Sequence, residues 1–145
     1  MTRTMQLLLL VGALQLVARG TDLLFSPKSG VAALDVGGAQ GAVWGITCLV
    51  AAAVVLVGLL RRSPLVVVQG SLIGFAIHGM FTWLVLENTI LSAPPDDWRI
   101  LADHATHSAL WLVFAVSISF RHGVHQILVR KGAGDGLGAD TIRGL

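Results

Sequence analysis

The sequence predicts an all-α integral membrane protein, a four-helix bundle with short loops, both termini in the cytoplasm and a disordered C-terminal tail. Of its 145 residues, 54% are hydrophobic and only 12% are charged. So few charges barely cover the surface of a soluble domain of this length. The apolar residues also form long runs, and each run is long enough to cross a bilayer core of about 30 Å as a helix.

The predicted spans come in order at residues 5–25, 42–60, 65–86 and 100–120, within one transmembrane domain over residues 1–131. Because a span takes about 20 residues, these spans leave no room for a sizeable domain outside the membrane. The remaining residues, 132–145, are glycine-rich and show no periodicity, which predicts a flexible cytoplasmic tail.

The connections carry turn and capping signals. Residues 61–64 read Arg-Arg-Ser-Pro, which predicts a tight turn between the second and third spans. Residues 26–41 are rich in glycine and predict a loop. Residues 88–99 contain a Pro-Pro pair followed by Asp96 and Asp97, and either aspartate is a candidate N-cap for the fourth helix.

The basic residues predict the orientation in the cell membrane, either a plasma or an inner membrane. Only Arg19, Lys28 and Arg99 fall on or towards the side of the membrane opposite to the termini. The positive-inside rule then places both termini and the turn at residues 61–64 in the cytoplasm. The basic residues on the predicted cytoplasmic side are Arg3, Arg61, Arg62, Arg121, Arg130, Lys131 and Arg143.

Ionisable side chains inside the apolar runs are the first candidates for a functional site. Such groups are costly in hydrocarbon, so they normally face a bundle interior or a water-filled cavity. Counted along the spans they fall at similar depth, in the outer third, so we expect one cluster near the outer leaflet. Its candidate members are Arg19, Asp22, His78, Asp103, His104 and His107.

Three interpretations of this cluster remain open. In the first, the groups only satisfy one another, for example through a salt bridge between Arg19 and Asp22, three residues apart on one helix. In the second, they form a ligand, quinone or proton-handling pocket, because histidine titrates near neutral pH. In the third they bind metal or haem, with His78 and either His104 or His107 as ligands. No recognised metal motif supports the third, so no metal site is predicted.

Glycines spaced by four residues predict close helix packing, because small residues let two helix backbones approach one another. Gly37, Gly41 and Gly45 form one such series at the start of the second span. Gly70 and Gly74 form another in the third span, and His78 continues their face of the helix.

Several classes of function are not indicated. No basic patch is interleaved with aromatic residues, so no nucleic-acid partner is expected. The single cysteine, Cys48, lies in an apolar run and has no partner for an intramolecular disulfide. No nucleophile, phosphate-loop or zinc-protease motif is present. The sequence therefore does not predict an enzyme that acts on its own.

Residues 45–79 carry a resemblance to a known family. A glycine-punctuated apolar helix ends in Val-Gly-Leu-Leu-Arg-Arg at residues 57–62, and a second apolar helix follows at once. This resembles the central helical hairpin of the DoxX-like family of small four-helix membrane proteins. Arg19 and Gly20 are compatible with the family pattern, and the resemblance covers about residues 7–90. It implies a four-helix bundle that serves membrane redox or thiol-oxidation complexes, often as an accessory subunit.

We therefore expect a small multi-pass membrane protein that acts as an accessory or ligand-binding subunit of a membrane complex, with redox-linked complexes included. Its expected partners are the lipid bilayer and either another membrane protein or further copies of itself. No cofactor is assigned, although haem and quinone both remain open. The alternatives are a holin-like, pore-forming lysis protein and a haem-binding membrane redox carrier.

Overall fold

The chain folds into four α-helices in a computed structural model, which describes residues 1–25, 39–87 and 98–143. Side chains are described except at residues 39, 40, 98 and 130–143. The all-helical fold predicted from the sequence is confirmed, and each helix is long and apolar enough to cross a membrane. The helices are α1 (Arg3–Phe25), α2 (Ala39–Leu60), α3 (Pro64–Val85) and α4 (Trp98–Arg143).

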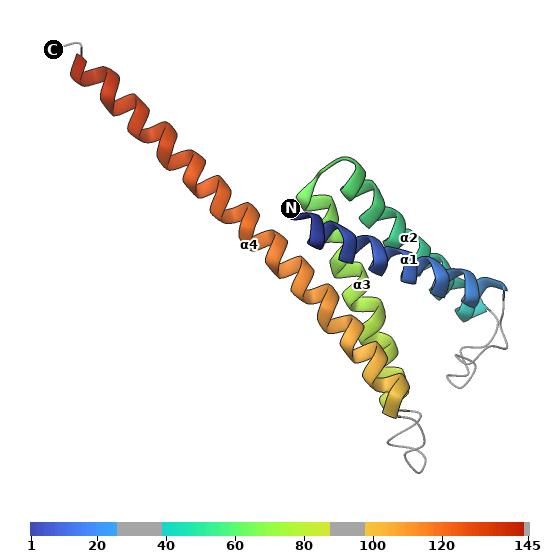
Figure 1. The fold of residues 1–145 in the computed structure, drawn as a ribbon. Coiled ribbons are helices and arrows are strands. Elements are labelled where there is room, and N and C mark those ends of the chain that lie inside the picture. Colours follow the sequence, from blue (N-terminus) through green and yellow to red (C-terminus); the bar gives the residue numbers. More distant parts are fainter. Residues whose placement is uncertain (26–38, 88–97, 144–145) are drawn as a thin grey trace.

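Each helix packs against the next one along the chain, α1 on α2, α2 on α3 and α3 on α4 (Figure 1). The first part of α4 also lies against α1, through side-chain contacts described below. The second part of α4 extends past the other three helices (Figure 1). The predicted turn at residues 61–64 joins α2 to α3. The predicted loop at residues 26–41 and the candidate caps Asp96 and Asp97 fall wholly or largely outside the described residues.

The turn between α2 and α3 closes in a defined hydrogen-bonding pattern. The Ser63 amide donates to the Gly58 carbonyl at 2.9 Å, and the Arg62 amide donates to the Leu59 carbonyl at 3.2 Å. This pair of bonds is the Schellman ending of a helix, and it needs a left-handed residue just past the helix end. Arg62 takes that position with φ 53°, where glycine is usual. Pro64 then starts α3, since its missing N–H is not needed in a first turn.

Glycines bring the helix backbones into direct contact. A Cβ added to Gly20 would lie 2.8 Å from the carbonyl oxygen of Gly45, and one added to Gly45 would lie 2.9 Å from that of Gly20. On the other side of α2, a Cβ at Gly70 would lie 2.9 Å from the backbone nitrogen of Val55. Any larger side chain would push these helices apart. Gly41 is partly buried in the first turn of α2, and Gly37 lies outside the described residues.

Trp111 of α4 fills the space that two other glycines leave open. A Cβ at Gly12 of α1 would lie 2.9 Å from Cζ2 of its indole, and one at Gly74 of α3 would lie 2.9 Å from Cδ2. The indole is 2% exposed and belongs to the main core cluster. One side chain therefore fixes α4 against both α1 and α3.

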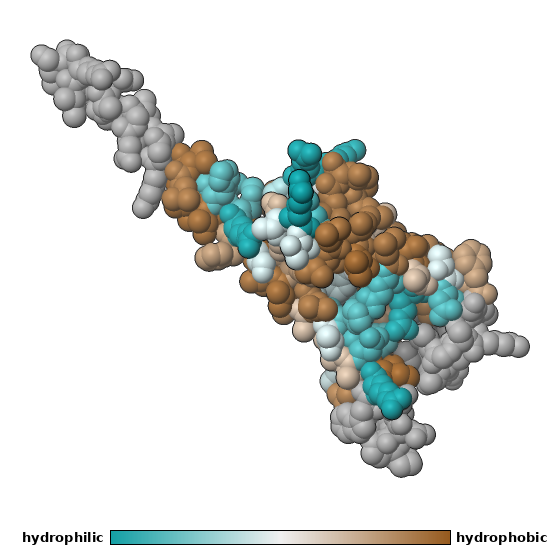
Figure 2. Space-filling view, viewed as in Figure 1, coloured by the Kyte–Doolittle hydropathy of each residue, from teal (hydrophilic) through white to brown (hydrophobic). Residues whose placement is uncertain are grey.

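The outside of the helices is largely apolar. Side chains such as Val11, Val57 and Val113 are 64%, 42% and 57% exposed, respectively. Figure 2 shows a hydrophobic surface over most of the described helices, with hydrophilic side chains gathered in separate regions. An apolar area of this extent is far larger than soluble monomers expose.

The C-terminal part of the chain differs from the prediction of a disordered tail from residue 132. The backbone of α4 continues as a helix through Arg143. No proline follows residue 95, so nothing in the backbone forces the helix to stop. Each glycine costs a helix about 1 kcal/mol relative to alanine, which weakens this stretch without terminating it.

Replacing Gly74 by valine should destabilise the fold by about 1–3 kcal/mol, since an overpacked core costs that much and the rigid Trp111 indole is held between two helices. Thermal unfolding of the purified chain in detergent measures the change. Gly123→Ala is the control, because a Cβ there meets nothing within 4 Å. If Gly74→Val unfolded at the wild-type temperature, the Trp111 indole would not be packed tightly against Gly74.

Candidate functional site

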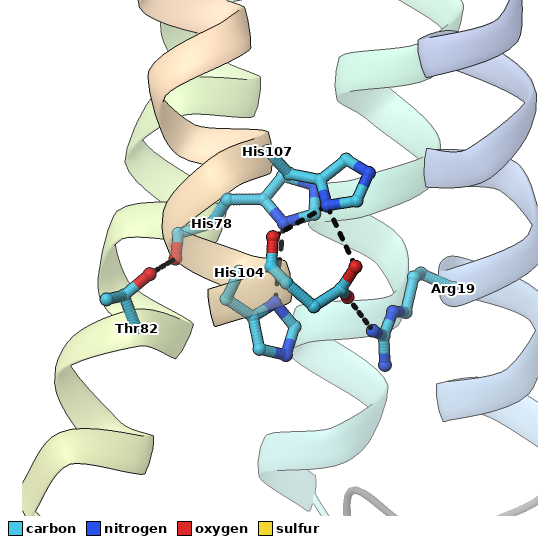
Figure 3. A network of polar contacts seen from close by, with 6 residues as sticks. Arg19, His78, Thr82, His104 and His107 are labelled. Atoms are coloured by element: carbon cyan, nitrogen blue, oxygen red, sulfur yellow. Dashed lines mark hydrogen bonds and ion pairs between the residues drawn. The ribbon is translucent and has the colours of Figure 1, made fainter. Parts of the chain in front are cut away.

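Five polar residues from three helices meet inside the bundle (Figure 3). They are joined by hydrogen bonds, ion pairs and ring contacts that link α1, α3 and α4. We call them the histidine cluster, and its members are Arg19, His78, Asp103, His104 and His107.

The packing of Trp111 between Gly12 and Gly74 explains why these residues meet. Asp103 and His107 precede Trp111 by eight and four residues, so they share its face of α4. His78 follows Gly74 by four residues and therefore continues the face of α3 that receives the indole. Seating Trp111 on Gly74 thus brings His107 to His78 one turn away.

Arg19 and Asp103 form the outer part of the cluster. The Arg19 Nη2 donates to Asp103 Oδ2 at 3.2 Å, and the two side chains are 28% and 44% exposed. The sequence left open a pairing of Arg19 with Asp22 on its own helix, and the structure places Arg19 in an ion pair with Asp103 of α4. This ion pair ties the last turns of α1 to the start of α4. Asp22 lies partly exposed one turn further along α1.

Asp103 also orients His107. The His107 Nδ1 lies 2.7 Å from the carbonyl oxygen of Asp103 and 3.2 Å from its Oδ1. Both neighbours are acceptors, so Nδ1 carries the proton in these contacts. A neutral His107 in this tautomer keeps the lone pair on Nε2.

His78 and His104 form the buried part of the cluster. Their Nδ1 atoms lie 3.4 Å apart, and the residues are 1% and 2% exposed. Two neutral imidazoles can bond in this way only if one Nδ1 donates and the other accepts, so the two rings hold opposite tautomers. The Nε2 of His78 is buried and has no hydrogen-bond partner. A buried polar atom of this kind costs about 1–3 kcal/mol.

Aromatic rings close the cluster on its apolar side. The rings of His78 and His107 stack with centroids 5.2 Å apart. Phe81 lies against His104 at 5.2 Å, and Trp44 of α2 lies against Phe81 at 5.5 Å. An apolar aromatic ring therefore lies against His104, and a second one lies behind it.

Ser71 carries a second buried, unpartnered polar atom, and the sequence did not single this residue out. Its Oγ is buried without a hydrogen-bond partner, as is the Nε2 of His78 seven residues later. Seven residues are two helical turns, so both atoms lie on the same buried face of α3. Ser71 lies between Gly70 and Gly74, and a small polar residue among packing glycines has no distinctive pattern in the sequence.

The cluster as arranged does not fit a haem or metal site. Two axial imidazoles must sit on opposite faces of a porphyrin, whereas His78 and His107 stack directly on each other and His78 contacts His104. Within the described residues, no group of three potential ligands is placed to hold a metal ion. His122 lies further along α4, where its Nε2 is 3.0 Å from Nε2 of Gln126.

No protein-family model, curated protein or solved structure matches this chain. Membership of the DoxX-like family therefore remains a prediction from the resemblance of residues 7–90.

Removing the ion pair should reveal a coupling between α1 and α4. In a double-mutant cycle of Arg19→Gln and Asp103→Asn, we expect a coupling free energy of about 1 kcal/mol, because both side chains are partly exposed. Thermal unfolding in detergent gives the change in unfolding free energy for each single variant and for the double variant. Arg19→Gln combined with Arg121→Gln serves as the additive control, and additivity in both pairs would contradict the ion pair.

Proposed function

We propose that this chain is a multi-pass protein of the cell membrane that acts as a ligand-binding accessory subunit, with the histidine cluster as its ligand site. The observation that carries the proposal is the buried, unpartnered Nε2 of His78 beside His104.

The proposed membrane placement rests on the helices and their surface. All four helices have the length and composition of membrane spans, and large apolar side chains cover their outward faces. Water would penalise such a surface, whereas lipid would not. The arginines at the ends of the first three helices favour the orientation with both termini in the cytoplasm.

The proposed ligand site follows from hydrogen-bond accounting. In a membrane bundle every buried polar group must find its partner within the protein or in a bound molecule. Four of the polar residues in the cluster form ion pairs or hydrogen bonds around His78, and Nε2 of His78 is left over. A ligand atom that bonds to this nitrogen would remove the cost of leaving it unpaired.

The surroundings select the class of ligand. Phe81 supplies aromatic surface beside His104, and Trp44 extends that surface behind Phe81. A molecule that enters from lipid must itself be apolar, and one hydrogen-bonding atom must reach His78. A quinone combines a flat apolar ring with carbonyl oxygens that accept hydrogen bonds, and it belongs to the redox setting that the DoxX-like resemblance implies.

An accessory role fits the simplicity of the chain. The described residues form helices and one tight turn, and the histidine cluster links α1, α3 and α4. A buried ligand site with no group of three potential metal ligands among the described residues suits a subunit that presents a ligand to a partner.

Cysteine labelling tests the membrane placement. In a Cys48→Ala background, Ser63→Cys lies in the turn after α2 and Glu87→Cys lies just past α3. A membrane-impermeant maleimide added to intact cells should label Glu87→Cys and spare Ser63→Cys until the cells are opened. Equal labelling of both would rule out the proposed topology.

Quinone binding should depend on the Nε2 position of His78. A short-chain benzoquinone added to the purified chain in detergent should raise the unfolding temperature, because a ligand stabilises the folded state that binds it. The variant His78→Phe keeps the ring and removes both nitrogens, and we expect about tenfold weaker binding from one lost hydrogen bond.

Two further variants sharpen this test. Glutamine places its amide nitrogen near the Nε2 position of histidine, and asparagine places it near Nδ1, so His78→Gln should retain more binding than His78→Asn. His122→Ala, outside the cluster, is the control. Binding that His78→Phe leaves unchanged would place the ligand elsewhere.

A further inference from the structure

A groove between α1 and α2 lies at the arginine-rich end of the bundle. It has a volume of about 390 Å³, within the range of about 300–1,000 Å³ that is typical of sites for small organic ligands. Its walls are leucines from the start of α1 and the end of α2, and Arg3 and Gln6 add polar groups. The leucines are Leu7, Leu10, Leu56, Leu59 and Leu60.

One arginine lines this groove, and two more follow one of its walls in the chain. Arg3 is the first residue of α1, one turn before Leu7. Leu60 is the last residue of α2, and Arg61 and Arg62 follow it directly in the exposed turn. The groove walls are therefore mostly leucine, and Arg61 and Arg62 lie within two residues of the last leucine of the wall.

The backbone at Arg62 gives independent support. Its φ of 53° is left-handed, a conformation that costs a residue with a Cβ about 1–2 kcal/mol. Glycine would adopt it at no such cost. A strained position that holds arginine in place of glycine suggests that the charge, rather than the turn, requires this side chain.

We infer that this groove binds an anionic phospholipid, with an acyl chain along the leucines and the phosphate at Arg3, Arg61 and Arg62. The charge complementarity selects the headgroup, and the leucine walls select the chain. The proposed orientation places the site in the cytoplasmic leaflet, where anionic lipids attract basic segments. The inference rests on the proposed membrane placement but is independent of the histidine cluster.

The test compares two lipids with identical chains. The purified full-length protein in detergent is titrated with dioleoyl phosphatidylglycerol or dioleoyl phosphatidylcholine, and the unfolding temperature is followed by tryptophan fluorescence. Phosphatidylglycerol should raise it in a saturable way, and phosphatidylcholine should not. Glycerol 3-phosphate is the third arm, and a matching effect from this soluble phosphate would overturn the lipid assignment.

The variants separate charge from fold. Arg62→Gly should raise the unfolding temperature without lipid, because the strain is relieved, yet it should weaken the response to phosphatidylglycerol. Combined with Arg3→Gln, the apparent affinity should fall about 25-fold, since each basic residue near an anionic surface contributes about a factor of five. Arg121→Gln removes the same charge from α4, outside this groove, and should keep the response.

Several outcomes would overturn the site. An equal response to both lipids would remove the headgroup preference. A double variant with wild-type affinity, or a loss caused by Arg121→Gln alone, would place the lipid elsewhere. If maleimide labelling supports the topology but the lipid experiments give these results, the proposal of a lipid site in the groove is wrong, and the proposed membrane placement stands.

Discussion

The seat of Trp111 between Gly12 and Gly74 is the contact on which the rest of the structure depends. The packing of α1 on α2, α2 on α3 and α3 on α4 would leave α1 and α4 free to separate. The indole of α4 contacts α1 at Gly12 and α3 at Gly74, and it can do so because neither glycine has a Cβ to block it. The position of every polar side chain within the next two turns then follows from helical geometry.

The histidine cluster is one consequence of that seat. His107 reaches His78 one turn from the indole, and Asp103 reaches Arg19 one turn further on. The cluster has an order from outside to inside, with a partly exposed ion pair at its edge and two buried imidazoles behind it. The polar groups at the exposed edge are paired with one another, whereas Nε2 of His78, at the buried end, has no hydrogen-bond partner. This gradient favours a site that completes its bonding with a ligand over one that only fixes the helices.

Much of the fold was predictable from the sequence, because the length and apolar composition of each run predict a helical span. Helical spacing also placed Asp103 with His107 and Gly74 with His78. The pairing of Arg19 with Asp103 was beyond such reasoning, since spacing relates residues on one helix and says nothing about which neighbour lies across from it. The role of Trp111 was missed for the same reason. Ser71 was missed because a small polar residue between two packing glycines has no distinctive pattern.

The central claim is that His78 and His104 meet in the interior of a membrane-embedded bundle. Solid-state NMR of the ¹⁵N-histidine-labelled protein in lipid bilayers measures this contact directly. We expect a dipolar contact between the two Nδ1 nuclei, one protonated and one not, which disappears in His104→Ala. Two imidazoles without such a contact, each free to exchange between tautomers, would contradict the arrangement of the cluster and the site built on it.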